Sequence, residues 1–322
     1  MPTSQDTDST KLITGYCEPW SLRAGEEIEW FGSSHIPTSG TLGIVRLDCG
    51  DPTRTGPGFA EAQVEAIETQ TVDLSSQRLL PGSYAEAIVS TPETKLLELS
   101  LWFQPTFLKR DGVLFSVSSG ESFVEVGNSG TELVARFCEV EAVVRDRPLE
   151  RHRWYFLSLK VDVQAGVAEI EISSPKSASP ARDLLQSGQD KCVVPISITF
   201  ADDLTLRLAA GVADGRWDGR IAAPKLVADG NHYEWEFEGD MEDAAITSVS
   251  GGAKLNLFQL PTRGVTGPTW SGEHQRWRDD PKQWNAIHFH HDDLYDAGWE
   301  TTGKFRLPAD LSSGIYCLRF ES

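Results

Sequence analysis

Short segments in which apolar and polar residues alternate recur along most of the chain. Four clear examples cover residues 96–103, 113–117, 154–162 and 166–172, and turn-forming Asp, Asn, Gly and Ser separate them. Alternation with a period of two places every second side chain on one face of an extended strand, so each segment predicts a β-strand. Helical patterns are few, with short candidates at 60–65 and 181–186. The pattern therefore predicts an all-β chain.

The strand patterns fall into three regions that differ in size. Two strands are predicted near the start, at 27–31 and 43–48, and two near the end, at 303–307 and 314–320. Two or three isolated strands are marginal in water, so neither end is expected to fold alone. Because the termini of a domain usually lie close together, we expect the two ends to form one small domain around an insertion. The predicted domains are a disordered tail (1–10), a discontinuous immunoglobulin-like β-sandwich with linkers (11–79 and 241–322) and a larger inserted sandwich (80–240).

The inserted region resembles a LamG or concanavalin A-like jelly roll. The resemblance is carried by residues 99–105, 150–159 and 211–226, which combine a Trp-containing strand, a Trp-Tyr-Phe-Leu strand and a loop that returns into a final strand. A lectin-like reading would place sugar or Ca²⁺ on the loops, with Asp202, Asp203 and residues 214–218 as candidates. Neither stretch shows the complete set of oxygen ligands that Ca²⁺ requires. A lectin-like binding module therefore stays an alternative function.

Composition excludes two classes of partner. The 322 residues include 48 Asp and Glu against 29 Lys and Arg, giving a formal net charge of −19. Nucleic acid and anionic membrane surfaces both attract cationic proteins, so neither is an expected partner. No apolar run approaches the about 20 residues of a membrane span, and the polar first ten residues lack the features of a secretory signal. The five cysteines are scattered without a C-x-x-C pair, which favours reduced thiols and a cytoplasmic location.

A histidine-rich segment near the end is the clearest candidate for chemistry. Residues 285–300 contain three of the seven histidines, and Asp292, Asp293 and Asp296 follow them. On a strand, His288, His290 and Asp292 would share one face. Such a set can hold zinc or iron, and a metal-bound water would make the chain a metal-dependent hydrolase. Alternatively, the imidazoles donate to the carboxylates and the segment is a polar corner that joins two packed layers. The sequence leaves both readings open.

Tryptophans upstream of this segment suggest a surface for packing or docking. Trp270, Trp277 and Trp284 are spaced by seven, but intervening Gly and Pro argue against a coiled coil. We expect the rings to anchor an extended loop across a sandwich face, since Trp combines a large apolar area with one hydrogen-bond donor. An aromatic binding cleft is the alternative. The predicted docking or structural residues are Trp270, Trp277, Trp284, His288, His290, Asp293 and Trp299.

Several motifs, taken in order, resemble the large (beta) subunit of N,N-dimethylformamidase and its relatives. They cover residues 15–26, 45–51, 56–59, 260–267, 286–300 and 308–316, and together they span nearly the whole chain. The histidine-rich piece is the most specific. This sequence departs from the family pattern at His291, where relatives usually carry an acidic residue.

The resemblance implies a hydrolase of small N-substituted amides that contains a large and a small subunit. It also implies a mononuclear iron held by tyrosines and a glutamate, in a region downstream of the part that matches. We therefore expect no catalytic residue and no cofactor in this chain, with iron in the associated catalytic region. The chain is predicted to be an accessory β-sandwich subunit or fragment of an amidohydrolase. Its expected partners are that catalytic chain or region and a small subunit, in an oligomer.

Overall fold

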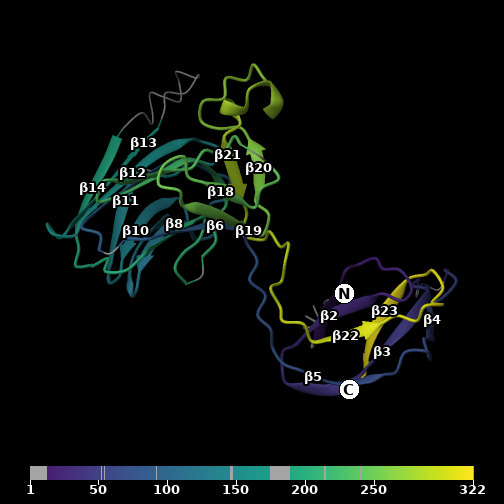
Figure 1. Cartoon of the computed structure of the whole chain (residues 1–322). Coiled ribbons are helices and arrows are strands. Elements are labelled where there is room, and N and C mark those ends of the chain that lie inside the picture. Colours follow the sequence, from purple (N-terminus) through teal and green to yellow (C-terminus); the bar gives the residue numbers. More distant parts are fainter. Residues whose placement is uncertain are drawn as a thin grey trace, which may run out of the picture. The chain divides into compact units, whose positions relative to one another are not determined.

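The computed structural model describes residues 13–51, 53, 55–91, 93–145, 148–174, 189–213, 215–239 and 241–321. The chain divides into two compact units, one formed by residues 1–80 and 297–322 and the other by residues 81–296 (Figure 1). Strands dominate both units, and the predicted all-β class is confirmed. Among the described residues, no helix has the length and apolar character needed to cross a membrane. The predicted tail (1–10) and the short helix at 181–186 lie outside the described residues.

The unit of residues 81–296 contains two large antiparallel sheets. The first has the order β11 (Val140–Arg145), β10 (Glu132–Phe137), β9 (Ser122–Ser129), β8 (Gly112–Ser119), β15 (Leu204–Leu208), β6 (Tyr84–Val89), β19 (Lys254–Phe258), β18 (Ala245–Thr247). The second has the order β14 (Gln189–Pro195), β13 (Val167–Ser173), β12 (Tyr155–Asp162), β7 (Leu96–Pro105), β16 (Gly219–Ala228), β21 (Ala286–Phe289), β20 (Thr262–Val265). The short strand β17 (Asn231–Glu234) also pairs with β16. We call these the β6 sheet and the β7 sheet.

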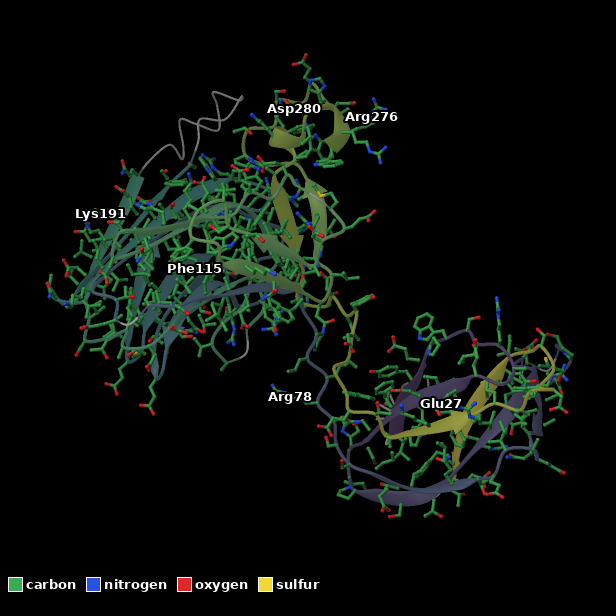
Figure 2. The ribbon with its side chains drawn as sticks, viewed as in Figure 1. Glu27, Arg78, Phe115, Lys191, Arg276 and Asp280 are labelled. Carbon is green, nitrogen blue, oxygen red and sulfur yellow. The ribbon has the colours of Figure 1, made fainter. Side chains whose placement is uncertain are left out.

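One apolar core lies between these two sheets. On β7 the alternate residues Leu97, Leu99, Leu101 and Phe103 are at most 1% exposed, and they share a buried cluster with residues of the β6 sheet such as Phe115. Figure 2 shows Phe115 in the interior of this unit. Burying each such side chain contributes about 1.5–3 kcal/mol, so the strand alternation read from the sequence supplies the main driving force for this sandwich.

Strands from both ends of the chain form the other unit. One sheet has the order β1 (Ile13–Glu18), β2 (Glu27–Ser34), β22 (Gly303–Arg306), and the other has the order β23 (Tyr316–Glu321), β3 (Thr38–Cys49), β4 (Ala60–Gln63), with β5 (Gln70–Leu74) also paired with β3. Thus each C-terminal strand pairs directly with an N-terminal strand, β22 with β2 and β23 with β3. Their buried core includes Trp30, Leu42, Ile44 and Phe305. The immunoglobulin-like topology of this unit stays a prediction.

Two expectations are corrected by the strand pairing. The predicted boundary at 240/241 is wrong, because residues 241–296 belong to the larger unit. There β19 pairs with β6 and β21 pairs with β16, so this segment completes both large sheets. The short helix predicted at 60–65 is also wrong, because residues 60–63 form β4, which pairs with β3. The helices found among the described residues are two single 3₁₀ turns, Trp277–Asp279 and Pro281–Gln283.

A close approach of two strands in the smaller unit gives a testable prediction. Gly303 lies opposite Trp30, and a Cβ on Gly303 would lie 2.6 Å from Trp30 Nε1. The Trp30 ring is 3% exposed and cannot move away freely. We expect Gly303→Ala to lower the free energy of unfolding of this unit by about 1–3 kcal/mol, as overpacking does. Urea unfolding followed by hydrogen exchange in β2 measures it. The control is Gly50→Ala, whose new Cβ would meet only Leu47 Cδ2 at 3.6 Å; equal stability of the two variants would contradict the packing described here.

Candidate functional site

The histidine-rich segment forms the end of β21 and the turn that follows. Ile287 and Phe289 are buried in the core of the larger unit, which leaves His288 and His290 on the opposite face of the β7 sheet. The rings of these two histidines lie 3.9 Å apart, centroid to centroid. The predicted sharing of one strand face by His288 and His290 is thus present, but the strand ends at Phe289, before Asp292.

Both of these histidines have hydrogen-bond partners within the larger unit. His288 Nε2 lies 3.1 Å from Thr106 Oγ1, and His290 Nδ1 lies 3.3 Å from Asp293 Oδ2. Because an ionised carboxylate can only accept, His290 donates to Asp293. This arrangement matches the reading of the segment as a polar corner held by hydrogen bonds.

Ser83, which is fully buried, links this corner to the start of the larger unit. Its hydroxyl donates to Asp293 Oδ2 (2.7 Å) and accepts from the backbone N–H of His290 (3.0 Å). Its own N–H donates to the carbonyl of His290 (2.9 Å), and the N–H of Gly82 donates to the carbonyl of Asp293 (2.7 Å). The corner therefore fastens residues 82–83 to residues 290–293, the two places where the chain enters and leaves this unit.

A second group lies around His291 in the turn after β21. Asp218, which immediately precedes β16, is 5% exposed, and its Oδ1 accepts from the backbone N–H of His291 (3.0 Å) and from Nδ1 of the same residue (2.7 Å). The His291 ring stacks on Phe107, with the ring centroids 5.8 Å apart and the planes at 16°. Asp292 is exposed, and one ligand atom each from Asp218, His291 and Asp292 all lie within 4.8 Å of one another.

The group of candidate metal ligands in the described part of the chain thus differs from the predicted one. Asp292 lies with Asp218 and His291, whereas His288 and His290 are joined to Thr106 and Asp293. Sequence reasoning noted Asp218 only as a calcium candidate and missed Ser83 and Thr106, which carry no local motif. One imidazole and two carboxylates also differ from the tyrosine and glutamate ligands that the family resemblance implies for iron. We therefore assign no iron to these residues.

Burial strongly affects the protonation of His288. Desolvation, together with the nearby charges of His290, Arg220 and His152, lowers the pKa of His288 from its usual 6.5 to about 3. The folded protein therefore keeps this imidazole neutral over a pH range in which the unfolded chain protonates it. A neutral His288 is consistent with a hydrogen bond to Thr106 and with packing against the His290 ring.

This shift predicts a specific dependence of stability on pH. Below pH 6.5 the unfolded chain binds a proton at His288 that the folded chain does not bind until about pH 3. The neutral His288 therefore contributes fully to the free energy of unfolding above pH 6.5, and its contribution falls as the pH drops toward 3. In His288→Gln the free energy of unfolding should fall less steeply over that range, as measured by urea unfolding at a series of pH values. His232→Gln removes an exposed histidine and serves as the control. If the free energy of unfolding of His288→Gln fell with pH as steeply as that of the control, the lowered pKa assigned to His288 would be contradicted.

The predicted tryptophans make separate contacts. The indole N–H of Trp270 donates to the carbonyl of His274 (2.9 Å), and that of Trp277 donates to the carbonyl of Glu238 (3.3 Å). Nε1 of Trp284 is buried without a partner among the described residues. In the other unit, the Trp299 indole N–H donates to the carbonyl of Arg78 (3.3 Å), and its ring lies 5.7 Å from that of Tyr16. The docking role of these residues stays a prediction.

The calcium candidates are partly accounted for by turn hydrogen bonds. The carboxylate of Asp203 accepts from Ser90 Oγ (3.2 Å) and from the backbone N–H of Thr91 (3.3 Å). The backbone N–H of Asp202 donates to Ser119 Oγ, and the Ser119 hydroxyl donates to the backbone carbonyl of Asp202, each at 3.0 Å. Asp214 lies outside the described residues. The contacts of Asp202 and Asp203 are those of residues that fix a loop.

Comparison with known proteins gives matches to one family. Residues 262–322 match the family model described as N,N-dimethylformamidase beta subunit-like, C-terminal. The chain is 25% identical to an N,N-dimethylformamidase beta subunit from Alcaligenes sp over an alignment that covers 96% of this chain and 47% of the relative. It is 26% identical to an N,N-dimethylformamidase beta subunit from Paracoccus aminophilus, over an alignment that covers 97% of this chain and 48% of that relative. The chain thus spans about half the length of these curated relatives, and the predicted resemblance is confirmed.

Solved structures with some likeness include β-sandwich proteins. A SAP-like pentraxin from Limulus polyphemus has a TM-score of 0.34 at 10% identity, covering 58% of this chain and 75% of that chain. The LG1-3 region of the laminin alpha2 chain has a TM-score of 0.35 at 11% identity, covering 62% and 49%.

Proposed function

Because the chain is similar to N,N-dimethylformamidase beta subunits along almost its whole length, we propose that it is the non-catalytic β-sandwich part of an amidohydrolase of that kind. In this proposal the chain supports a catalytic region that hydrolyses small N-substituted amides. The iron and the residues that act on the amide belong to that region, outside residues 1–322. The chain contributes a folded support and a surface on which the catalytic region packs.

The single observation that carries this proposal is the extent of the match. The alignments use 96–97% of this chain but only 47–48% of the relatives, so the relatives contain a further half that this chain does not match. If the reacting residues of the relatives lie in that half, as the resemblance implies, this chain corresponds to the supporting half. The catalytic region or chain and a small subunit are then its partners in a cytoplasmic oligomer.

The geometry of the histidine corner supports a structural role for the most specific family motif. His290, Asp293 and Ser83 bond to one another and fasten together the two ends of the larger unit. A catalytic reading with His288, His290 and Asp292 as metal ligands is less well supported, because Asp292 groups with other residues.

Native purification tests the proposal. Material isolated with this chain should hydrolyse N,N-dimethylformamide, measured as release of dimethylamine, and should contain iron. After separation in mild denaturant and renewed folding, activity and iron should follow the fraction that lacks residues 1–322. Activity that follows this chain, free of any other polypeptide region, would contradict the supporting role.

A further inference from the structure

We propose that Asp218, His291 and Asp292 form a binding site for one divalent transition-metal ion, separate from the iron implied for the catalytic region. Asp218 immediately precedes β16, and His291 and Asp292 lie in the turn after β21. One ligand atom of each residue lies within 4.8 Å of those of the other two. A bound cation would join this turn to the start of β16. This inference rests on the geometry of the larger unit alone and does not depend on the proposed function.

The charge of the group favours a cation. One carboxylate oxygen of Asp218 lies within 4.8 Å of one of Asp292, and Asp218 is 5% exposed whereas Asp292 is exposed, so the site brings two acidic groups together at the edge of the protein interior. The guanidinium of Arg216 lies 4.4 Å above the Tyr84 ring, and Arg216 Nε donates to the carbonyl of Gly82 (3.1 Å). A divalent ion would offset the negative charge that the two carboxylates bring together.

The ligand atoms are available for such an ion. Asp218 Oδ1 accepts both of its hydrogen bonds from His291, and Oδ2 has no partner within the described part of the chain. No ion pair or hydrogen bond involves the Asp292 side chain in the same described part, whereas its neighbours His291 and Asp293 bond to Asp218 and His290. Stacking against Phe107 holds the His291 ring in place, which reduces the entropy lost when the ring binds an ion.

Binding requires one rearrangement of a proton. In the metal-free state the proton on His291 Nδ1 is donated to Asp218. When the ion binds Nδ1, the proton is carried on Nε2 instead, which leaves the Nδ1 lone pair free to coordinate. Imidazole with carboxylates suits divalent transition ions better than Ca²⁺ or Mg²⁺, which take oxygen ligands, and water completes the coordination.

Titration with Mn²⁺, followed by the loss of its free-ion electron paramagnetic resonance signal, tests the site on the full chain after treatment with a chelator. Mn²⁺ is chosen because it has little affinity for the five cysteines, which would compete for Zn²⁺. We expect one bound Mn²⁺ per chain. Asp292→Asn and His291→Gln should each weaken binding by about tenfold or more. Asp310→Asn, which changes an exposed carboxylate of the other unit, should leave binding unchanged.

The Asp292→Asn variant is suited to the test, because Asp292 is exposed and its side chain makes no hydrogen bond or ion pair within the described part of the chain. Metal-free thermal unfolding of that variant at the temperature of the unaltered chain, or above it because the repulsion with Asp218 is removed, verifies this. Absence of stoichiometric Mn²⁺ binding would overturn the proposal, and so would binding that Asp292→Asn leaves intact. Binding abolished by His288→Gln but not by His291→Gln would overturn it in favour of the other histidine set.

Discussion

A chain that ends at Asp296 is expected to lose the folded unit of residues 1–80 while residues 81–296 keep their fold. The truncation removes β22 and β23, which pair with β2 and β3, and it removes Phe305 from the core around Trp30. The remaining strands would form small open sheets with one apolar face in water, which are not stable on their own. Hydrogen exchange read by mass spectrometry distinguishes the two units in one experiment, with protection lost in β2 and β3 and kept in β7 and β12.

Residues 81–296 produced alone are the matched control for this experiment. They should show the same thermal unfolding midpoint as the larger unit in the truncated chain, because every strand pair of both large sheets lies within these residues. Protection of β2 and β3 in the truncated chain at the level of the full chain would contradict the pairing of the two ends.

Replacing Trp235 by alanine is expected to lower the free energy of unfolding of the larger unit by about 3–5 kcal/mol, the range for removing a large aromatic side chain from a core. Trp235 is 0% exposed and stacks on Tyr233 with the ring centroids 6.4 Å apart. Its indole N–H donates to the carbonyl of Ala253 (3.1 Å), so the substitution removes a hydrogen bond as well as apolar contacts. Urea unfolding measures the loss.

Trp270→Ala provides the comparison, since Trp270 is 40% exposed and its indole N–H donates to the carbonyl of His274 in the neighbouring loop. Trp270→Ala should lower the free energy of unfolding much less than Trp235→Ala does. If both substitutions cost the same, Trp235 would not be the core residue that the structure shows.

Local alternation predicted the strands of this chain well because the pattern is set within each segment. The side chains of residues 96–103 and 154–162 predict strands by themselves, and these segments form most of β7 and all of β12. The same reasoning failed for residues 241–296. Whether β19 pairs with β6 or with another strand depends on residues about 170 positions earlier in the chain. The side chains within a short segment do not determine such a long-range pairing. The error at 60–65 has the same origin, since pairing with β3 overrides the intrinsic helical preference of Ala and Glu.

The candidate site was predicted in part for similar reasons. The period of two correctly placed His288 and His290 on one face, because both lie on or directly beside β21. Asp292 left that face because the chain turns after Phe289, and no feature of the sequence fixes where a strand of four residues ends. Asp218 lies 73 positions before His291, so their contact could not be read from spacing. Clustered histidine and aspartate identified the segment, and tertiary structure decided which residues meet.

We propose that this chain supports amide hydrolysis without carrying out the reaction. The most direct measurement is the release of dimethylamine from N,N-dimethylformamide by the purified chain alone, after incubation with iron and removal of unbound metal. We expect no turnover above the uncatalysed rate and no iron held by tyrosine side chains, which would give a visible charge-transfer absorption. Turnover by the isolated chain, with iron bound to its own residues, would show that the chain is itself catalytic.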